Sequence, residues 1–139
     1  VGWRLLSRRS EPARQPLTPE EQVREALTQL AAIDVSHQSG AREFCFGLTV
    51  AMKSYLEALC DINASDMTTP EISSAIENTR LPREHRIEFV QLMRAADRVK
   101  YAGDAAHVDE LRRLHQVATR FVDRAQPEPI HDLPARASS

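Results

Sequence analysis

The chain of 139 residues has few of the residues that build sheets and disulfide frameworks. It holds four glycines and two cysteines, and it has few runs of Val, Ile or Thr. Strands favour β-branched and aromatic residues, so this composition argues against a sheet. Only 5% of the residues are aromatic while 42% are hydrophobic, so Leu, Val, Ile, Met and Ala must fill the core. A chain of this length is expected to form one domain.

Catalytic and nucleotide-binding motifs are also missing. The sequence has no glycine-rich phosphate loop, no HExxH, no CxxC and no GxSxG. The closest metal-like set is Asp104, His107 and Glu110, but such spacings are common by chance and acids belong at a helix N-terminus anyway. We expect His37 to lie in a loop and His115 to pack at the edge of the core. The sequence therefore predicts no metal, no cofactor and no catalytic residue.

The two cysteines are not expected to pair. Cys45 and Cys60 are 15 residues apart on one predicted helix, which separates them by about 22 Å. A disulfide needs Cα atoms within about 7 Å of each other. Nothing else in the sequence suggests a disulfide scaffold, so we expect free thiols and a reducing compartment.

The central element of the predicted fold is a helix over residues 41–61. Its large apolar residues recur at helical spacing: Phe44, Leu48, Met52, Tyr55, Leu56 and Leu59. Charged residues such as Arg42, Lys53 and Glu57 interrupt the stretch, so it cannot be a membrane span.

Four other stretches are also predicted to be helices, from start signals or from apolar periodicity. The sequence TPEE at residues 18–21 starts a helix that we expect to extend to residue 34, because Thr can cap, Pro suits the first turn and Glu completes a capping box. TTPE at 68–71 repeats this signal and begins a short helix. Apolar periodicity predicts further helices over 82–102 and 107–124.

These patterns predict an all-α fold: a five-helix antiparallel bundle, four long helices and one short, with disordered termini. Short connections favour antiparallel neighbours, and we expect the central helix to pack against the other three long helices. The bundle should span residues 18–125. Residues 126–139, with three prolines and a Ser-Ser end, are predicted to be a disordered tail.

The N-terminal residues 1–17 differ from the rest in charge. They carry a net charge of +3, which leaves −5 for the remainder because the chain totals −2. Trp3 favours a membrane interface, and Arg4, Arg8 and Arg9 favour the cytoplasmic side of a span. We interpret the segment as a membrane-proximal basic linker after a transmembrane helix upstream of Val1. The alternative is an ordinary N-terminal arm that contains a few arginines.

The candidate binding residues are Asp97, Arg98, Lys100 and Tyr101. Asp97 and Lys100, three residues apart, can pair on one helix face. The amphipathic ring of Tyr101 suits an interface, so one reading is a docking patch. In the other reading, Val99 and Tyr101 pack inward while Lys100 lays its stem over the core.

Nucleic acid is an unfavourable partner because the predicted bundle is acidic overall. The basic residues that such a partner would need are Arg80, Arg83, Arg86, Arg112 and Arg113. We therefore predict no nucleic-acid binding.

The order of motifs resembles the cytoplasmic C-terminal region of membrane-anchored bacterial aerotolerance-operon proteins, the BatD-like group. The motifs that carry the resemblance are Thr18-Pro19-Glu20-Glu21, Arg42-Glu43-Phe44, Tyr55-Leu56-Glu57, Thr68-Thr69-Pro70-Glu71 and Ala96-Asp97-Arg98-Val99-Lys100-Tyr101. They span about residues 3–125 together with the basic linker. Tyr101 stands where the family has Phe, and Arg98 where an apolar residue is common.

The resemblance implies an inner-membrane protein that works with MoxR-type AAA+ ATPases and with proteins carrying von Willebrand A domains. It supplies no catalytic residues. We therefore expect a non-catalytic helical protein-interaction domain on the cytoplasmic face of the bacterial inner membrane. The alternative is a small-ligand-binding or enzymatic helical domain, which would need a deep pocket with converging polar groups.

Overall fold

A computed structural model describes residues 16–101 and 106–127 of the chain. Its elements are α2 (Pro19–Ala31), α3 (Gln38–Leu59), the 3-10 turn η1 (Ala64–Asp66), α4 (Thr69–Ala75), the 3-10 turn η2 (Ile76–Asn78), α5 (Arg83–Tyr101) and α6 (Val108–Arg124). Within these described residues, the predicted all-α fold of five helices, four long and one short, is confirmed. The predicted linker residues Trp3, Arg4, Arg8 and Arg9 and nearly all of the predicted tail lie outside the described residues.

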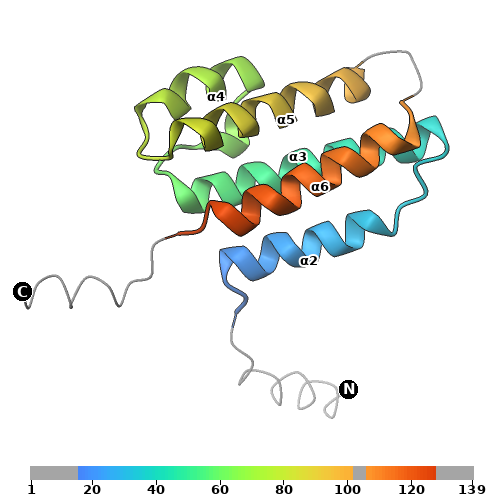
Figure 1. Cartoon of the computed structure of the whole chain (residues 1–139), viewed down its shortest axis with the longest axis horizontal. Coiled ribbons are helices and arrows are strands. Elements are labelled where there is room, and N and C mark those ends of the chain that lie inside the picture. The colour runs from blue at the N-terminus through green and yellow to red at the C-terminus, as the bar shows by residue number, and fades with distance from the viewer. Residues whose placement is uncertain (1–15, 102–105, 128–139) are drawn as a thin grey trace, which may run out of the picture.

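The four long helices lie side by side as antiparallel neighbours (Figure 1). Helix α3 packs against α2 and α5, and α6 packs against the same two helices from the other side. The short α4 packs on α5 at the end of the bundle where α3 stops and α5 starts (Figure 1). Helix α3 also contacts α6, so it touches the other three long helices, as predicted.

Both predicted capping boxes are present. The Thr18 Oγ1 atom accepts from the backbone N–H of Glu21 at 3.1 Å, and the Glu21 carboxylate accepts from the Thr18 N–H at 2.8 Å. Thr68 and Glu71 make the same reciprocal pair at the start of α4, at 3.3 and 2.8 Å. Each box satisfies two backbone donors that the first turn of a helix leaves without partners.

The connection between α2 and α3 is tighter than predicted. Helix α3 starts at Gln38, three residues before the predicted start, so Gly40 lies in its first turn rather than in a loop. A Cβ atom at Gly40 would lie 1.9 Å from the carbonyl oxygen of Asp34. Glycine at this position lets the new helix begin directly against the end of the connection.

The apolar stripe predicted on α3 forms the centre of the core. Phe44, Leu48, Met52, Tyr55 and Leu56 are buried, and Leu59 is half-buried. Side chains of α5 and α6 close around them, among them the fully buried Phe89, Met93, Phe121 and Val122.

The two cysteines behave as small core residues. Cys45 and Cys60 are both free and buried. Burial raises the pKa of the Cys45 thiol to about 11, in spite of the nearby charge of Lys100. Burial also raises the pKa of Cys60. A reactive cysteine needs a lowered pKa, so neither thiol fits that role.

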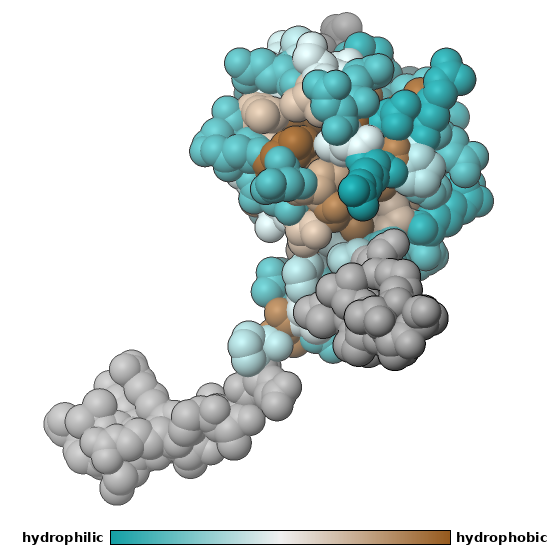
Figure 2. All heavy atoms as spheres, turned by 90° about the vertical axis from the view of Figure 1, so that its left-hand side faces the viewer, coloured by the Kyte–Doolittle hydropathy of each residue, from teal (hydrophilic) through white to brown (hydrophobic). Residues whose placement is uncertain are grey.

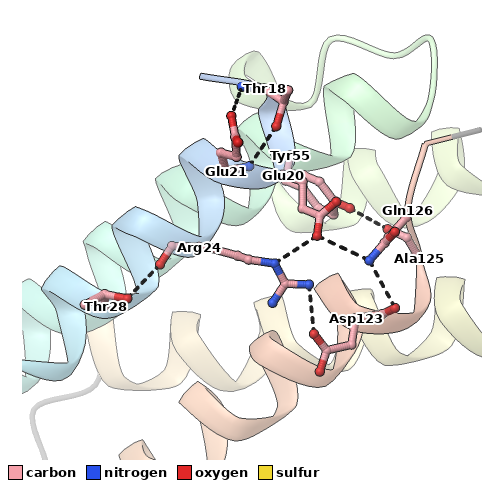
Figure 3. Close-up of polar contacts among 9 residues, drawn as sticks. All are labelled: Thr18, Glu20, Glu21, Arg24, Thr28, Tyr55, Asp123, Ala125 and Gln126. Carbon is pink, nitrogen blue, oxygen red and sulfur yellow. Dashed lines mark hydrogen bonds and ion pairs between the residues drawn. The ribbon is translucent and has the colours of Figure 1, made fainter. Parts of the chain in front are cut away.

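Polar contacts join the first and last helices at one end of the bundle (Figure 3). Arg24 of α2 pairs with Glu20 and with Asp123 of α6, each at 2.9 Å. Next to them the buried Tyr55 hydroxyl donates to the carbonyl of Ala125 at 2.7 Å. This bond ties the central helix to the residue that follows α6.

The end of the bundle that carries α4 has a mostly hydrophilic surface. Figure 2 shows hydrophilic side chains over most of this face, with hydrophobic atoms exposed between them near its centre. Among the helices of residues 16–101 and 106–127, none combines the length and the apolarity that a bilayer span requires.

Candidate interaction surface

The predicted pair of Asp97 and Lys100 is formed near the end of α5. The Lys100 Nζ atom lies 3.2 Å from the Asp97 carboxylate. The other carboxylate oxygen accepts a hydrogen bond from the hydroxyl of Thr69, the first residue of α4, at 2.6 Å. Only 6% of the Lys100 side chain is exposed. The pair therefore holds a buried charge in place and joins α4 to α5.

Two aromatic rings complete the surroundings of Lys100. Its Nζ atom lies 5.0 Å from the ring centre of Phe46 on α3 and 5.1 Å from that of Tyr101. The rings contact each other edge to face, with their centres 6.2 Å apart. A cation is attracted to a ring face at such distances. Lys100 thus contacts two rings from different helices, and the three side chains form one cluster.

Both rings also face solvent. Phe46 is 44% exposed and Tyr101 is 71% exposed, and Val50, one turn beyond Phe46, is exposed as well. We call Phe46, Val50 and Tyr101 the aromatic edge. Large apolar side chains grouped in this way on a surface are characteristic of binding sites.

A groove between α2 and α3 begins beside the aromatic edge. Its volume is about 580 Å³, and Phe46 and Val50 form part of its α3 wall, opposite Val23 and Ala26 of α2. The wall also includes Gly47, where a Cβ atom would lie 2.6 Å from the Leu30 side chain. The groove and the aromatic edge make one continuous, largely apolar surface.

The predicted candidate residues divide between two faces. Asp97, Lys100 and Tyr101 gather beside α3, whereas Arg98 is exposed and lines a groove between α5 and α6 with Arg113. Val99 is buried, as the packing reading predicted. Lys100 is buried too, while Tyr101 is exposed as the docking reading required.

Sequence reasoning missed Phe46 and Val50. Both lie outside the apolar stripe of α3, four residues apart on its exposed side. Apolar residues at this spacing are neighbours on a helix surface. This pattern was the available signal for a second, exposed apolar face on the central helix.

A second groove, of about 510 Å³, lies between the α2–α3 connection and α6, with Phe44, Arg112 and His115 in its lining. His115 is half-buried and its ring centre is 6.3 Å from that of Phe44. Its Nε2 atom is 2.8 Å from the Leu27 carbonyl oxygen. His115 therefore packs at the edge of the core, as predicted.

No metal centre is apparent in the part of the chain that the structure describes. No group of three or more His, Cys, Asp or Glu side chains could hold an ion there. His107 precedes α6 and is exposed, and Glu110 is half-buried in its first turn. Their predicted companion Asp104 lies outside the described residues. His37 is an exposed residue just before α3.

The arginines considered for nucleic-acid binding are spread over several faces. Arg83 and Arg86 line a groove between α4 and α5. Arg112 borders the groove beside His115, and Arg113 borders the groove between α5 and α6. Arg80 is exposed ahead of α5. These five residues do not form a single basic face.

The chain matches no protein-family model, and neither a curated protein nor a solved structure is significantly similar to it. The resemblance to BatD-like proteins therefore stays a prediction.

Proposed function

We propose that this protein is a non-catalytic helical domain that docks a protein partner through the aromatic edge and the adjoining α2–α3 groove. The observation that carries this proposal is the exposed ring pair of Phe46 and Tyr101 held by the buried Lys100. Rings that are already fixed lose little side-chain entropy when a partner binds. Aromatic residues are also enriched among the side chains that contribute most to binding energy.

The identity of the partner and the location are proposed from sequence alone. Following the resemblance, we propose a MoxR-type AAA+ ATPase or a protein with a von Willebrand A domain as the partner. We also propose that the bundle lies at the cytoplasmic face of the bacterial inner membrane, attached through a segment upstream of Val1. The basic linker with Trp3, Arg8 and Arg9 supports this orientation.

A small-ligand or enzymatic domain remains the alternative, and it has less support. The largest fully buried side chains are aromatic, Leu, Ile, Met and Val residues, which fill the interior. In the second groove, the Nε2 atom of His115 already contacts a backbone carbonyl. Neither observation favours a site with converging, unoccupied polar groups, which a ligand or an enzymatic reaction would need.

The experiment is capture of partners from gently solubilised membranes with the full-length protein as bait. We expect the ATPase or von Willebrand A protein to be captured by the parent and lost with the double variant Phe46→Ser, Tyr101→Ser. Ile87→Ser is the matched control, because Ile87 is an exposed apolar residue of α5 away from the edge. Ile87→Ser should leave the melting temperature near that of the parent, because Ile87 is exposed. The double variant removes two rings that contact the buried Lys100, so its melting temperature should fall somewhat, and the measurement shows that the bundle is still folded at the temperature of capture.

Two results would contradict this proposal. One is full capture by the double variant, which would exclude the aromatic edge as the docking surface. The other is failure of residues 18–125 to capture a partner that the full-length protein binds. Recognition would then depend on the upstream segment, and the bundle would be a spacer or regulator.

A further inference from the structure

A basic groove lies on the opposite side of α5 from its contact with α6. It runs between α5 and the short elements α4 and η2, with a volume of about 280 Å³. Three arginines of α5, Arg83, Arg86 and Arg94, line it together with one carboxylate, Glu77. The groove therefore carries a net positive charge on a chain that is acidic overall.

The three arginines have no acidic partner among the described residues, where every ion pair involves other groups. The Nη1 atom of Arg86 donates to the Leu81 carbonyl at 2.7 Å, which fixes the side chain. Its Nε atom is buried and has no hydrogen-bond acceptor. A buried donor without an acceptor costs free energy, and a carboxylate near this guanidinium would offset part of that cost through its charge.

The spacing of these charges indicates an extended ligand. Arg86 and Arg94 are eight residues apart on one helix, which is about 12 Å along its axis. Ile87 and Val90 lie between them, and Ile87 is 43% exposed. Two acidic side chains four residues apart on an extended strand are separated by about 13 Å. An apolar side chain midway between them would point to the same face, toward the part of the groove that Ile87 and Val90 line.

This pattern occurs in the chain's own sequence at residues 128–132, Glu-Pro-Ile-His-Asp. In an extended conformation Glu128, Ile130 and Asp132 share one face, and Pro129 favours extended backbone for itself and for the residue before it. These residues lie outside the described part of the chain.

The segment leaves the bundle at the end where the groove starts. Helix α6 ends at the end of the bundle where α5 begins (Figure 1), and the Phe121 ring centre is 6.2 Å from that of His85. Glu128 is three positions after Ala125, which is a reach of about 10 Å. A chain that enters at the start of α5 would meet Arg83 and Arg86 first and Arg94 last. Covalent attachment gives such a segment a high effective concentration at the groove.

We propose that residues 128–132 dock in the α4–α5 groove, with Glu128 at Arg83 and Arg86, Ile130 at Ile87, and Asp132 at Arg94. This contact covers the basic groove and leaves the aromatic edge free.

The test is paramagnetic broadening of amide NMR signals in the full chain with a nitroxide at Ala135→Cys. The native cysteines are buried and should stay unlabelled. We expect the Gln91 and Arg94 signals to broaden. The broadening should be lost in Arg94→Glu and return when Asp132→Arg is added. Arg98→Glu is the matched control, because Arg98 is exposed on the same helix but lines a different groove, and it should keep the broadening.

Sharp Gln91 and Arg94 signals in the labelled parent would overturn the proposal. So would broadening that persists in the variant Glu128→Gln, Asp132→Asn, because the contact would then not depend on these charges. A mixture of nitroxide-labelled chains and isotope-enriched chains without nitroxide distinguishes a tail that docks in its own chain from a tail that docks in another copy. Broadening in that mixture at the level of the parent would assign the docked segment to another copy and overturn docking within one chain.

Discussion

At the scale of single residues, Lys100 is the most informative side chain. An ammonium group buried to this degree loses most of its hydration, and only good partners compensate the loss. Here the partners are the Asp97 carboxylate and the faces of Phe46 and Tyr101. We interpret the buried ammonium group as a means of orienting the two exposed rings.

Removing Asp97 should destabilise the protein more than removing the charge of Lys100. In Asp97→Ala the buried ammonium loses its carboxylate, and we expect the free energy of unfolding to fall by about 2 kcal/mol. In Lys100→Met the stem remains, while Asp97, which is 31% exposed, keeps water and Thr69 as partners. That variant should lose less than about 1 kcal/mol. Urea unfolding measures the free energy of unfolding of both variants. Equal losses would contradict the view that the unpaired ammonium costs more than the unpaired carboxylate.

At the scale of elements, two glycines set how α2 and α3 meet. At Gly40 an added Cβ would lie 1.9 Å from a backbone oxygen of Asp34, and at Gly47 it would lie 2.6 Å from the end of the Leu30 side chain. A backbone atom cannot move away without shifting the connection, whereas a leucine side chain can rotate.

The two alanine variants should therefore differ in stability. Gly40→Ala should lower the free energy of unfolding by about 3 kcal/mol, at the upper end for overpacking. In Gly47→Ala the displacement of Leu30 is offset by the better helix propensity of alanine, worth about 1 kcal/mol, so the net loss should be small. Both are measured by chemical denaturation. A Gly40→Ala protein as stable as the parent would show that the connection is more tolerant than its geometry indicates.

At the scale of the whole molecule, Tyr55 connects the middle of the chain to its end. Its buried hydroxyl donates to the carbonyl of Ala125, 70 residues away, near the exposed contact of Arg24 with Asp123 (Figure 3). Exposed ion pairs add little to stability, so the buried bond should contribute more to closing this end of the bundle.

This bond predicts a pH-dependent difference between the parent and Tyr55→Phe. At neutral pH the variant should be less stable by about 1 to 2 kcal/mol, because the Ala125 carbonyl loses its donor. Burial raises the pKa of Tyr55 from 10.0 to about 12. The unfolded chain therefore releases this proton first, and the parent loses stability as the pH rises from 10 to about 12.

The phenylalanine variant lacks this titration, so the two stabilities should converge over that range. Urea unfolding at neutral pH and in alkaline buffer measures the difference. Cys45 titrates in the same direction in both proteins, with its pKa raised to about 11, and so cancels in the comparison. A difference that stays constant with pH would contradict burial as the cause.

Much of the fold could be predicted because its signals are local. Both capping boxes, the stripe of α3 and the pairing of Asp97 with Lys100 depend on residues within a few turns of one another. The surface around Lys100 was only half predictable, since Phe46 lies 54 positions from Lys100. No local pattern indicates that these two side chains meet.

The sequence by itself determined the helical class, the starts of α2 and α4, and the central place of α3, because capping and apolar periodicity act within single helices. Only the tertiary structure decided that Lys100 is buried while its neighbour Tyr101 is exposed. It also decided that Arg98 faces another groove and that Phe46 and Val50 complete an exposed edge. The physical reason is that burial depends on which helices pack against a given face, and that choice involves the whole core.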